Sequence, residues 1–164
     1  MTEAVLNEVE LLTSRLRQLE AAEAVRRLLA RYGAACDRCD LEAVVALFSE
    51  DGCVEAGGRT WVGRECVRTF FSDAWATDRS KKTHFIVNVV AGELAGARLD
   101  VRSTFLYTGA GAKLSVLGWG EYHDVVDVSQ PEAAFQLKGV DLKWAGDVRS
   151  GWATDDASME RACP

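Results

Sequence analysis

Residues 19–52, LEAAEAVRRLLARYGAACDRCDLEAVVALFSEDG, carry the pattern of two amphipathic helices followed by a break. Apolar side chains recur at steps of three and four along the first part, which predicts a helix that ends near residue 35. Asp40 is placed to cap a second helix over residues 41–48, whose apolar side chains fall on one face. The turn SEDG at 49–52 then ends that helix.

The same periodicity extends upstream to the beginning of the chain. An apolar stripe at steps of four and three is formed by Val5, Val9, Leu12, Leu16 and Leu19. Residues 1–20 are therefore predicted to form a helical N-terminal extension of the domain. Because the stripe covers only about two heptads, too few for an independent coiled coil, we expect it to lie against the domain or a partner subunit.

Downstream of residue 52 the pattern changes from helical to mainly extended. Two short extended pieces within 53–62 flank Gly57-Gly58, which is typical of a hairpin turn, and a third helix is predicted over 64–75. Four segments rich in β-branched and aromatic residues follow, at 83–90, 97–107, 113–128 and 134–148. Three helices followed by a run of antiparallel strands predict one α+β domain over residues 1–164.

The composition fits a single globular domain without stabilising metal or disulfides. The chain has 164 residues, of which 48% are hydrophobic, enough to bury roughly two thirds of the unfolded surface. The net charge is −6 and the basic residues form no long run, which argues against nucleic acid as a partner. No stretch is long and apolar enough for a membrane span, and the acidic N-terminus differs from a secretion signal. These features predict a cytoplasmic protein.

Five cysteines, at positions 36, 39, 53, 66 and 163, are an odd number in a chain with no expected export signal. Reduced thiols are therefore expected rather than a disulfide framework. The positions 53 and 66 lack the close spacing of a zinc-binding pair, so no metal site is predicted.

Four polar residues, each set among residues that otherwise indicate core, are the candidates for catalysis. His84 with Asp37 as its partner could take and return a proton near neutral pH. Tyr32 and Arg149 could stabilise an oxygen that gains charge. These residue types suit a lyase or isomerase that uses no cofactor.

The strand that begins near His84 sets a testable geometry. Simple alternation places His84, Ile86 and Asn88 on one face, and both faces of the strand are apolar, so His84 is expected to be buried and to need a hydrogen-bond partner. Asp37 is the candidate. Tyr32 and Asp37 are about 140° apart on a continuous helix, so they share a cavity only if the helix ends near residue 36.

Four segments together resemble a known family. They are residues 19–52, KKTHFIVNVV at 81–90, GWGEYHDVV at 118–126 and LKWAGDVRSGW at 142–152. Their order and spacing resemble the SnoaL-like branch of the nuclear-transport-factor-2-like superfamily. The resemblance implies a cone of strongly curved antiparallel sheet, covered by three N-terminal helices and enclosing one pocket. This fold also hosts isomerases, cyclases and subunits without catalysis, so it does not by itself fix the function.

Within the superfamily the chain is most similar to two dehydratases, bile acid 7α-dehydratase and scytalone dehydratase. The resemblance implies that Tyr32, Asp37, His84 and Arg149 are catalytic, and that Asp124 corresponds to a pocket asparagine. The second pocket histidine of scytalone dehydratase has no counterpart here, which favours chemistry with a single histidine. Alternation places His123 on the face opposite Asp124, as a surface or subunit-contact residue.

The predicted ligand is a flat, hydrophobic small molecule such as a polyketide, steroid or terpenoid. Residues expected to line its pocket are Asn88, Tyr122, Asp124, Phe105, Trp61 and Trp144. No nucleotide or flavin motif is present, so no cofactor is predicted. The resulting hypothesis is a dehydratase that uses His-Asp acid-base catalysis. The alternatives are a cyclase or isomerase with the same pair and a non-catalytic binding or assembly subunit, and a homodimer or homotrimer is expected.

Overall fold

The computed structural model describes residues 3–77, 80–111 and 115–148. Its helices are α1 (Glu3–Asp37), α2 (Leu41–Val45) and α3 (Arg64–Thr77). Its strands are β1 (Phe48–Ala56), β2 (Arg59–Val62), β3 (Lys81–Ala91), β4 (Arg98–Ala110), β5 (Ser115–Asp127) and β6 (Ala134–Asp147). Among the described residues, no helix combines the length and hydrophobicity that a membrane crossing requires.

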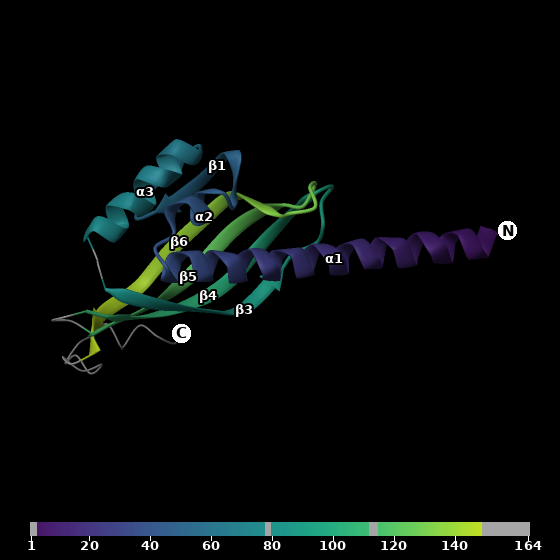
Figure 1. Cartoon of the computed structure of the whole chain (residues 1–164). Helices are drawn as coiled ribbons and strands as arrows, with labels where there is room; N and C mark the ends of the chain where they lie inside the picture. The colour runs from purple at the N-terminus through teal and green to yellow at the C-terminus, as the bar shows by residue number, and fades with distance from the viewer. Residues whose placement is uncertain (1–2, 78–79, 112–114, 149–164) are drawn as a thin grey trace.

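The six strands form one curved, unclosed sheet in the order β2-β1-β6-β5-β4-β3 (Figure 1). The predicted α+β class is confirmed. All neighbours are antiparallel except β1 and β6, which run parallel, a departure from the expected all-antiparallel sheet. The second helix is shorter than predicted, because Phe48 begins β1 and is fully buried in the core instead of continuing the helix.

The helices cover one face of the sheet, here called the inner face. Apolar side chains from α1, α3 and the inner face form a continuous core, which includes Val25, Leu28, Phe48, Val67, Leu99, Val126 and Phe135. The opposite face, here called the outer face, has no helix over it in the described part of the chain (Figure 1). Phe85 and Trp119 on this face are 48% and 43% exposed, so the expectation that β3 is buried on both faces is wrong.

A bulge in β3 changes which residues share a face with His84. The register shifts between Val87 and Val90, and Asn88 takes a left-handed conformation with φ 52°. The extra residue breaks the alternation, so Asn88 is exposed, and Val89 rather than Asn88 lies beside Ile86. Simple alternation therefore assigned the face of Asn88 incorrectly.

Helix α1 ends at Asp37 in a Schellman turn. The N–H of Asp40 donates to the carbonyl of Ala35, and the N–H of Cys39 donates to the carbonyl of Cys36, both at 3.0 Å. Cys39 has φ 50°, the left-handed conformation that this position in the turn requires. The turn stops the helix where the carboxylate of Asp37 reaches β3.

Candidate active site

Asp37 and His84 form a hydrogen-bonded pair, as the sequence predicted. Oδ1 of Asp37 accepts from the backbone N–H of His84 at 2.9 Å and lies 2.7 Å from Nδ1 of the same residue. An ionised carboxylate only accepts, so Nδ1 carries the proton and Nε2 of the neutral ring keeps a lone pair. The side chain of His84 is 13% exposed, so the ring is largely shielded but not sealed from solvent. The arrangement fits a general base.

The pair opens onto a groove of about 420 Å³ between α1 and β3. This volume lies within the range of small-molecule sites. The helix contributes one face, at spacings of three and four residues, and the strand contributes mostly apolar side chains. The lining residues are Arg26, Leu29, Ala30, Gly33, Ala34, Asp37, His84, Ile86 and Val89. The groove is therefore apolar along its walls, with the acid-base pair at one end and a guanidinium at the other.

Tyr32 lies in a buried aromatic layer beneath the groove and does not line it. Its ring meets Tyr122 edge-on at 5.9 Å and Phe135 at 5.7 Å, and Phe105 stacks on Tyr122 at 4.3 Å. Because α1 continues through Asp37, Tyr32 and Asp37 point to different sides of the helix, as the angle between them requires. Burial raises the pKa of both Tyr32 and Tyr122, so these phenols remain protonated hydrogen-bond donors.

The same layer contains a buried ion pair that the sequence did not reveal. Nζ of Lys138 lies 2.8 Å from Oδ2 of Asp124, and both side chains are fully buried. The ammonium also lies 3.3 Å from the ring centroid of Tyr122 and 4.6 Å from that of Tyr32, distances typical of cation–π contacts. Burial lowers the pKa of Lys138 and raises that of Asp124, while their mutual attraction opposes both shifts. Lys138 is thus held by a carboxylate and aromatic faces.

A bulge in β6 explains why Lys138 was missed. Phe135 and Lys138 are three residues apart, so strict alternation would place them on opposite faces. The register shifts between Val125 and Val126, which pairs Val126 with Phe135 and Asp124 with Lys138. The extra residue, Gln136, puts both Phe135 and Lys138 on the inner face. Asp124 was predicted to line the substrate pocket, but it is buried against Lys138, a partner that was not predicted.

The other predicted pocket residues are spread over the molecule. Phe105, Tyr122 and Asp124 are buried on the inner face. Trp144 was expected in the pocket, but it pairs with Trp119 on the outer face. The neighbours of Trp119 in β5, Gly118 and Gly120, are the residues that take the inner positions. Trp61 packs on Phe70 of α3 at 4.8 Å and under Arg59, away from the groove. Arg149 lies outside the described residues.

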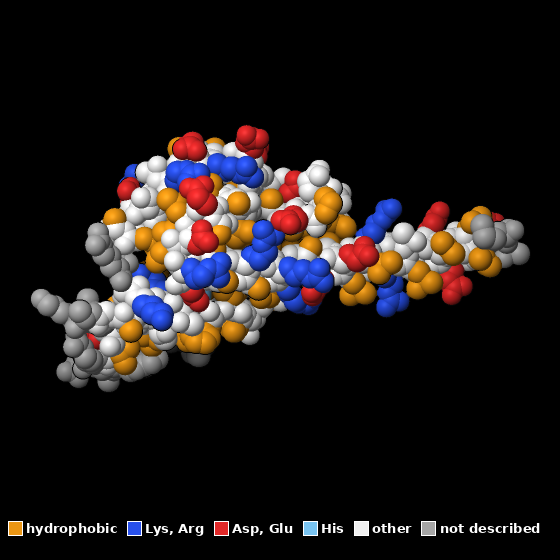
Figure 2. Space-filling model, viewed as in Figure 1, with side chains coloured by type: hydrophobic (Ala, Val, Ile, Leu, Met, Phe, Trp, Pro, Cys, Tyr) orange, Lys and Arg blue, Asp and Glu red, His pale blue; other side chains and the backbone are white. Residues whose placement is uncertain are grey.

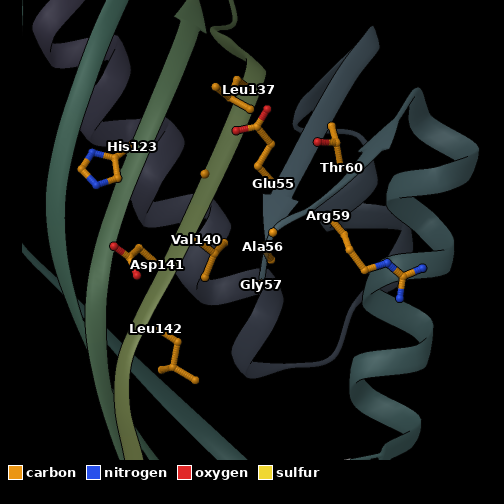
Figure 3. Close-up of a pocket in the computed structure, with 12 residues that line it drawn as sticks. Glu55, Ala56, Gly57, Arg59, Thr60, His123, Leu137, Val140, Asp141 and Leu142 are labelled. Carbon is orange, nitrogen blue, oxygen red and sulfur yellow. The ribbon is translucent and has the colours of Figure 1, made fainter.

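A second hollow, of about 770 Å³, lies between the β1–β2 hairpin and strands β5 and β6. Figure 3 shows His123 and Asp141 on one side of it and Arg59 and Thr60 on the other. Glu121, His123 and Asp141 converge there in a way that could suit a metal ion. However, Nζ of Lys143 lies 2.5 Å from Asp141 and 3.8 Å from Glu121, so these carboxylates already have a cationic partner. We interpret this cluster as a surface ion-pair network.

The described cysteines, Cys36, Cys39, Cys53 and Cys66, are all free thiols. Burial raises the pKa of Cys36 to about 12, whereas Cys39 and Cys66 are exposed. Since the thiolate is the nucleophile, brief alkylation of the folded protein at neutral pH is expected to label Cys39 and Cys66 well before Cys36. Peptide mapping by mass spectrometry measures this order, and alkylation of the unfolded protein is the control. Equally fast labelling of Cys36 in the folded protein would contradict its burial.

The curved sheet with helices over one face is a cystatin-like fold, which this chain shares with the solved structure of an NTF2-like protein from Novosphingobium aromaticivorans. The model of the SnoaL-like domain matches residues 17–130, and the chain belongs to this family. The family assignment made from the four sequence segments is thus confirmed. No curated protein matches the chain significantly.

Several solved structures share the fold. A candidate scytalone dehydratase from Novosphingobium aromaticivorans has a TM-score of 0.71 at 21% identity, covering 83% of this chain and 91% of that one. A hexachlorocyclohexane dehydrochlorinase (LinA, type 2) has a TM-score of 0.74 at 14% identity, covering 88% and 99%. The beta subunit of a candidate aromatic-ring-hydroxylating dioxygenase from Novosphingobium aromaticivorans has a TM-score of 0.64 at 15% identity, covering 80% and 92%. At these identities the likeness establishes the fold alone.

Proposed function

We propose that this protein is a lyase without a cofactor, which removes water from a hydrophobic small molecule. The observation that carries the proposal is the 2.7 Å contact between Nδ1 of His84 and Oδ1 of Asp37 beside an apolar groove. Two of the structural neighbours are named for eliminations, because a dehydratase removes water and a dehydrochlorinase removes hydrogen chloride. An elimination that forms a C=C bond requires a base that takes a proton from carbon, which is the role assigned to His84.

In the proposed reaction Nε2 of His84 takes a proton from a carbon next to a carbonyl group of the substrate. The electron pair of that C–H bond forms the new C=C bond, and the C–O bond to the hydroxyl group on the next carbon breaks. The imidazolium then returns its proton to the departing hydroxyl, which leaves as water. Asp37 acts as a positioning residue that fixes the tautomer and stabilises the transient imidazolium.

The groove suggests which substrates could bind. Its walls are apolar, and Arg26 lies eleven residues before Asp37 on the same helix, about 16 Å away at 1.5 Å per residue. An elongated hydrophobic molecule with its reacting carbon at His84 and a polar or anionic group near Arg26 would match these features. Tyr32 lies in the buried layer below, so its predicted role at the enolate oxygen has no support from the residues that line the groove.

A panel of hydrophobic β-hydroxy carbonyl compounds, with and without a distal carboxylate, tests the proposal. The expected product has lost one molecule of water and absorbs in the ultraviolet, because the new C=C bond is conjugated with the carbonyl. Mass spectrometry and absorbance follow both changes. Deuterium incorporation from heavy water into remaining substrate would report the proton transfer directly.

Other outcomes of the same assay would replace the proposal. A product of unchanged mass would indicate an isomerase or cyclase that uses the same acid-base pair. Absence of turnover together with stoichiometric copurification of a larger oxygenase subunit would instead support an assembly role. The partly buried contact between Asp37 and His84 favours catalysis, because assembly alone has no need for such a pair.

A further inference from the structure

The first four turns of α1 project away from the rest of the protein (Figure 1). The helix first meets the body of the domain through Gln18, whose side chain donates to the carbonyl of Gly92 at 2.8 Å and accepts from the N–H of Leu94 at 2.7 Å. Residues 3–17, here called the projecting segment, are exposed throughout. The space-filling view shows hydrophobic and charged side chains interleaved along it (Figure 2).

An apolar stripe on the projecting segment has no cover in the described part of the chain. It consists of Val5, Val9, Leu12 and Leu16, spaced as the a and d positions of a heptad repeat and 43% to 55% exposed. An isolated helix of this length is marginal in water unless its apolar side is packed. We propose that the projecting segments of two copies of this chain pack against each other as an antiparallel pair of helices.

The charges of the projecting segment favour the antiparallel direction. Its first half contains Glu3, Glu8 and Glu10 and no basic residue, whereas its second half contains Arg15 and Arg17 and no acidic residue. An antiparallel pair places the acidic half of each copy against the basic half of the other, and it also aligns the helix dipoles favourably. A parallel pair would place the two acidic halves side by side.

The heptad spacing and the body of the domain together favour the register with the longest overlap that the body permits. When Val9 packs against the partner's Leu12 and Val5 against the partner's Leu16, Glu8 lies beside the partner's Arg15. The overlap then covers residues 3–18, of which residues 3–17 are exposed. A shift by one heptad would place residue 3 opposite position 25, but Val25 is fully buried in the partner's own core, so that register is blocked.

Leu12→Glu tests the proposed contact between the two apolar stripes, because it places two carboxylates near the centre of the helix pair. Sedimentation velocity of the full-length protein over a wide concentration range is expected to show a dimer that this change weakens by about tenfold or more. Leu11→Glu is the matched control, since Leu11 is also exposed, at 59%, but lies off the stripe. Circular dichroism of each variant checks that the body remains folded. A monomeric wild type, or an assembly indifferent to Leu12→Glu, would overturn the proposal.

Charge reversal tests the direction of the helices. Glu8→Arg and Arg15→Glu should each weaken the dimer, and the combination of both should restore it, because the pair is then re-formed with opposite signs. A parallel pair would instead place Arg15 beside the partner's Glu20. In that case Arg15→Glu alone would weaken association and adding Glu8→Arg would not restore it, which would refute the antiparallel arrangement.

Discussion

Replacing His84 with alanine is expected to lower kcat of the proposed dehydration by about 10²- to 10⁴-fold, the usual contribution of a positioned general base. The reason is that the groove has no second imidazole among its lining residues that could replace His84 as the base. Initial rates measure the loss. Substrate or product-analogue binding should persist, because the apolar walls of the groove remain.

Two further variants make the His84 experiment specific. His123→Ala is the matched control, because His123 is the other histidine of the chain and lies on the outer face. It should leave turnover unchanged. Asp37→Asn keeps the shape of the side chain, but its amide N–H can donate to Nδ1 and so favour the tautomer with a proton on Nε2. This variant should lose turnover and alter the pH profile of kcat. Full activity of His84→Ala would refute the proposed mechanism.

Replacing Lys138 with methionine is expected to lower the free energy of unfolding by about 3–5 kcal/mol, because Asp124 would then be a buried charge without a partner. Asp124→Leu should lower the free energy of unfolding by a similar amount, because Lys138 would then be the buried charge without a partner. The double variant Lys138→Met with Asp124→Leu should recover most of the loss, since an apolar pair of similar volume no longer buries a charge. Urea denaturation of all four proteins gives the coupling energy between the two sites.

The exposed pair Lys143 and Asp141 is the matched control for this comparison of four proteins. It joins the same residue types at 2.5 Å on the surface, where water screens both charges. Lys143→Met should change the urea midpoint very little. If Lys138→Met changed the urea midpoint as little as Lys143→Met, Lys138 would not carry a buried charge in the folded protein. The interior ion pair would then be refuted.

The helices and the pairing of Asp37 with His84 could be read from the sequence. The apolar periodicity of α1, the cap at Asp40, whose Oδ1 accepts from the N–H of Ala43, and the chemical need of a shielded His84 for a partner each follow from neighbours in sequence or from a general rule. Asp37 was named as that partner because the family resemblance aligned Asp37 and His84 with an aspartate and a histidine of known dehydratases.

Strand bulges contribute to the placement of three side chains, whereas Tyr32 and Trp61 lie away from the groove without a bulge. Asn88, Lys138 and Trp144 all lie on strands whose register is interrupted, at Val87/Val90 in β3 and at Val125/Val126 and Trp119/Gly120 between β5 and β6. One extra residue reverses the face of every later side chain in the strand. Composition and spacing along one strand contain no sign of such a shift, because it depends on the partner strand.

The amino-acid sequence by itself determined the α+β class, the SnoaL-like family and the pairing of a carboxylate with an imidazole, because these depend on periodicity and on short motifs. Only the tertiary structure decided which side chains meet. It separated Tyr32 from the groove, placed Lys138 against Asp124 in the interior and left residues 3–17 of α1 exposed within the described part of the chain. The physical reason is that bulges and the end of a helix change direction locally, whereas burial and charge pairing depend on segments that are distant in sequence.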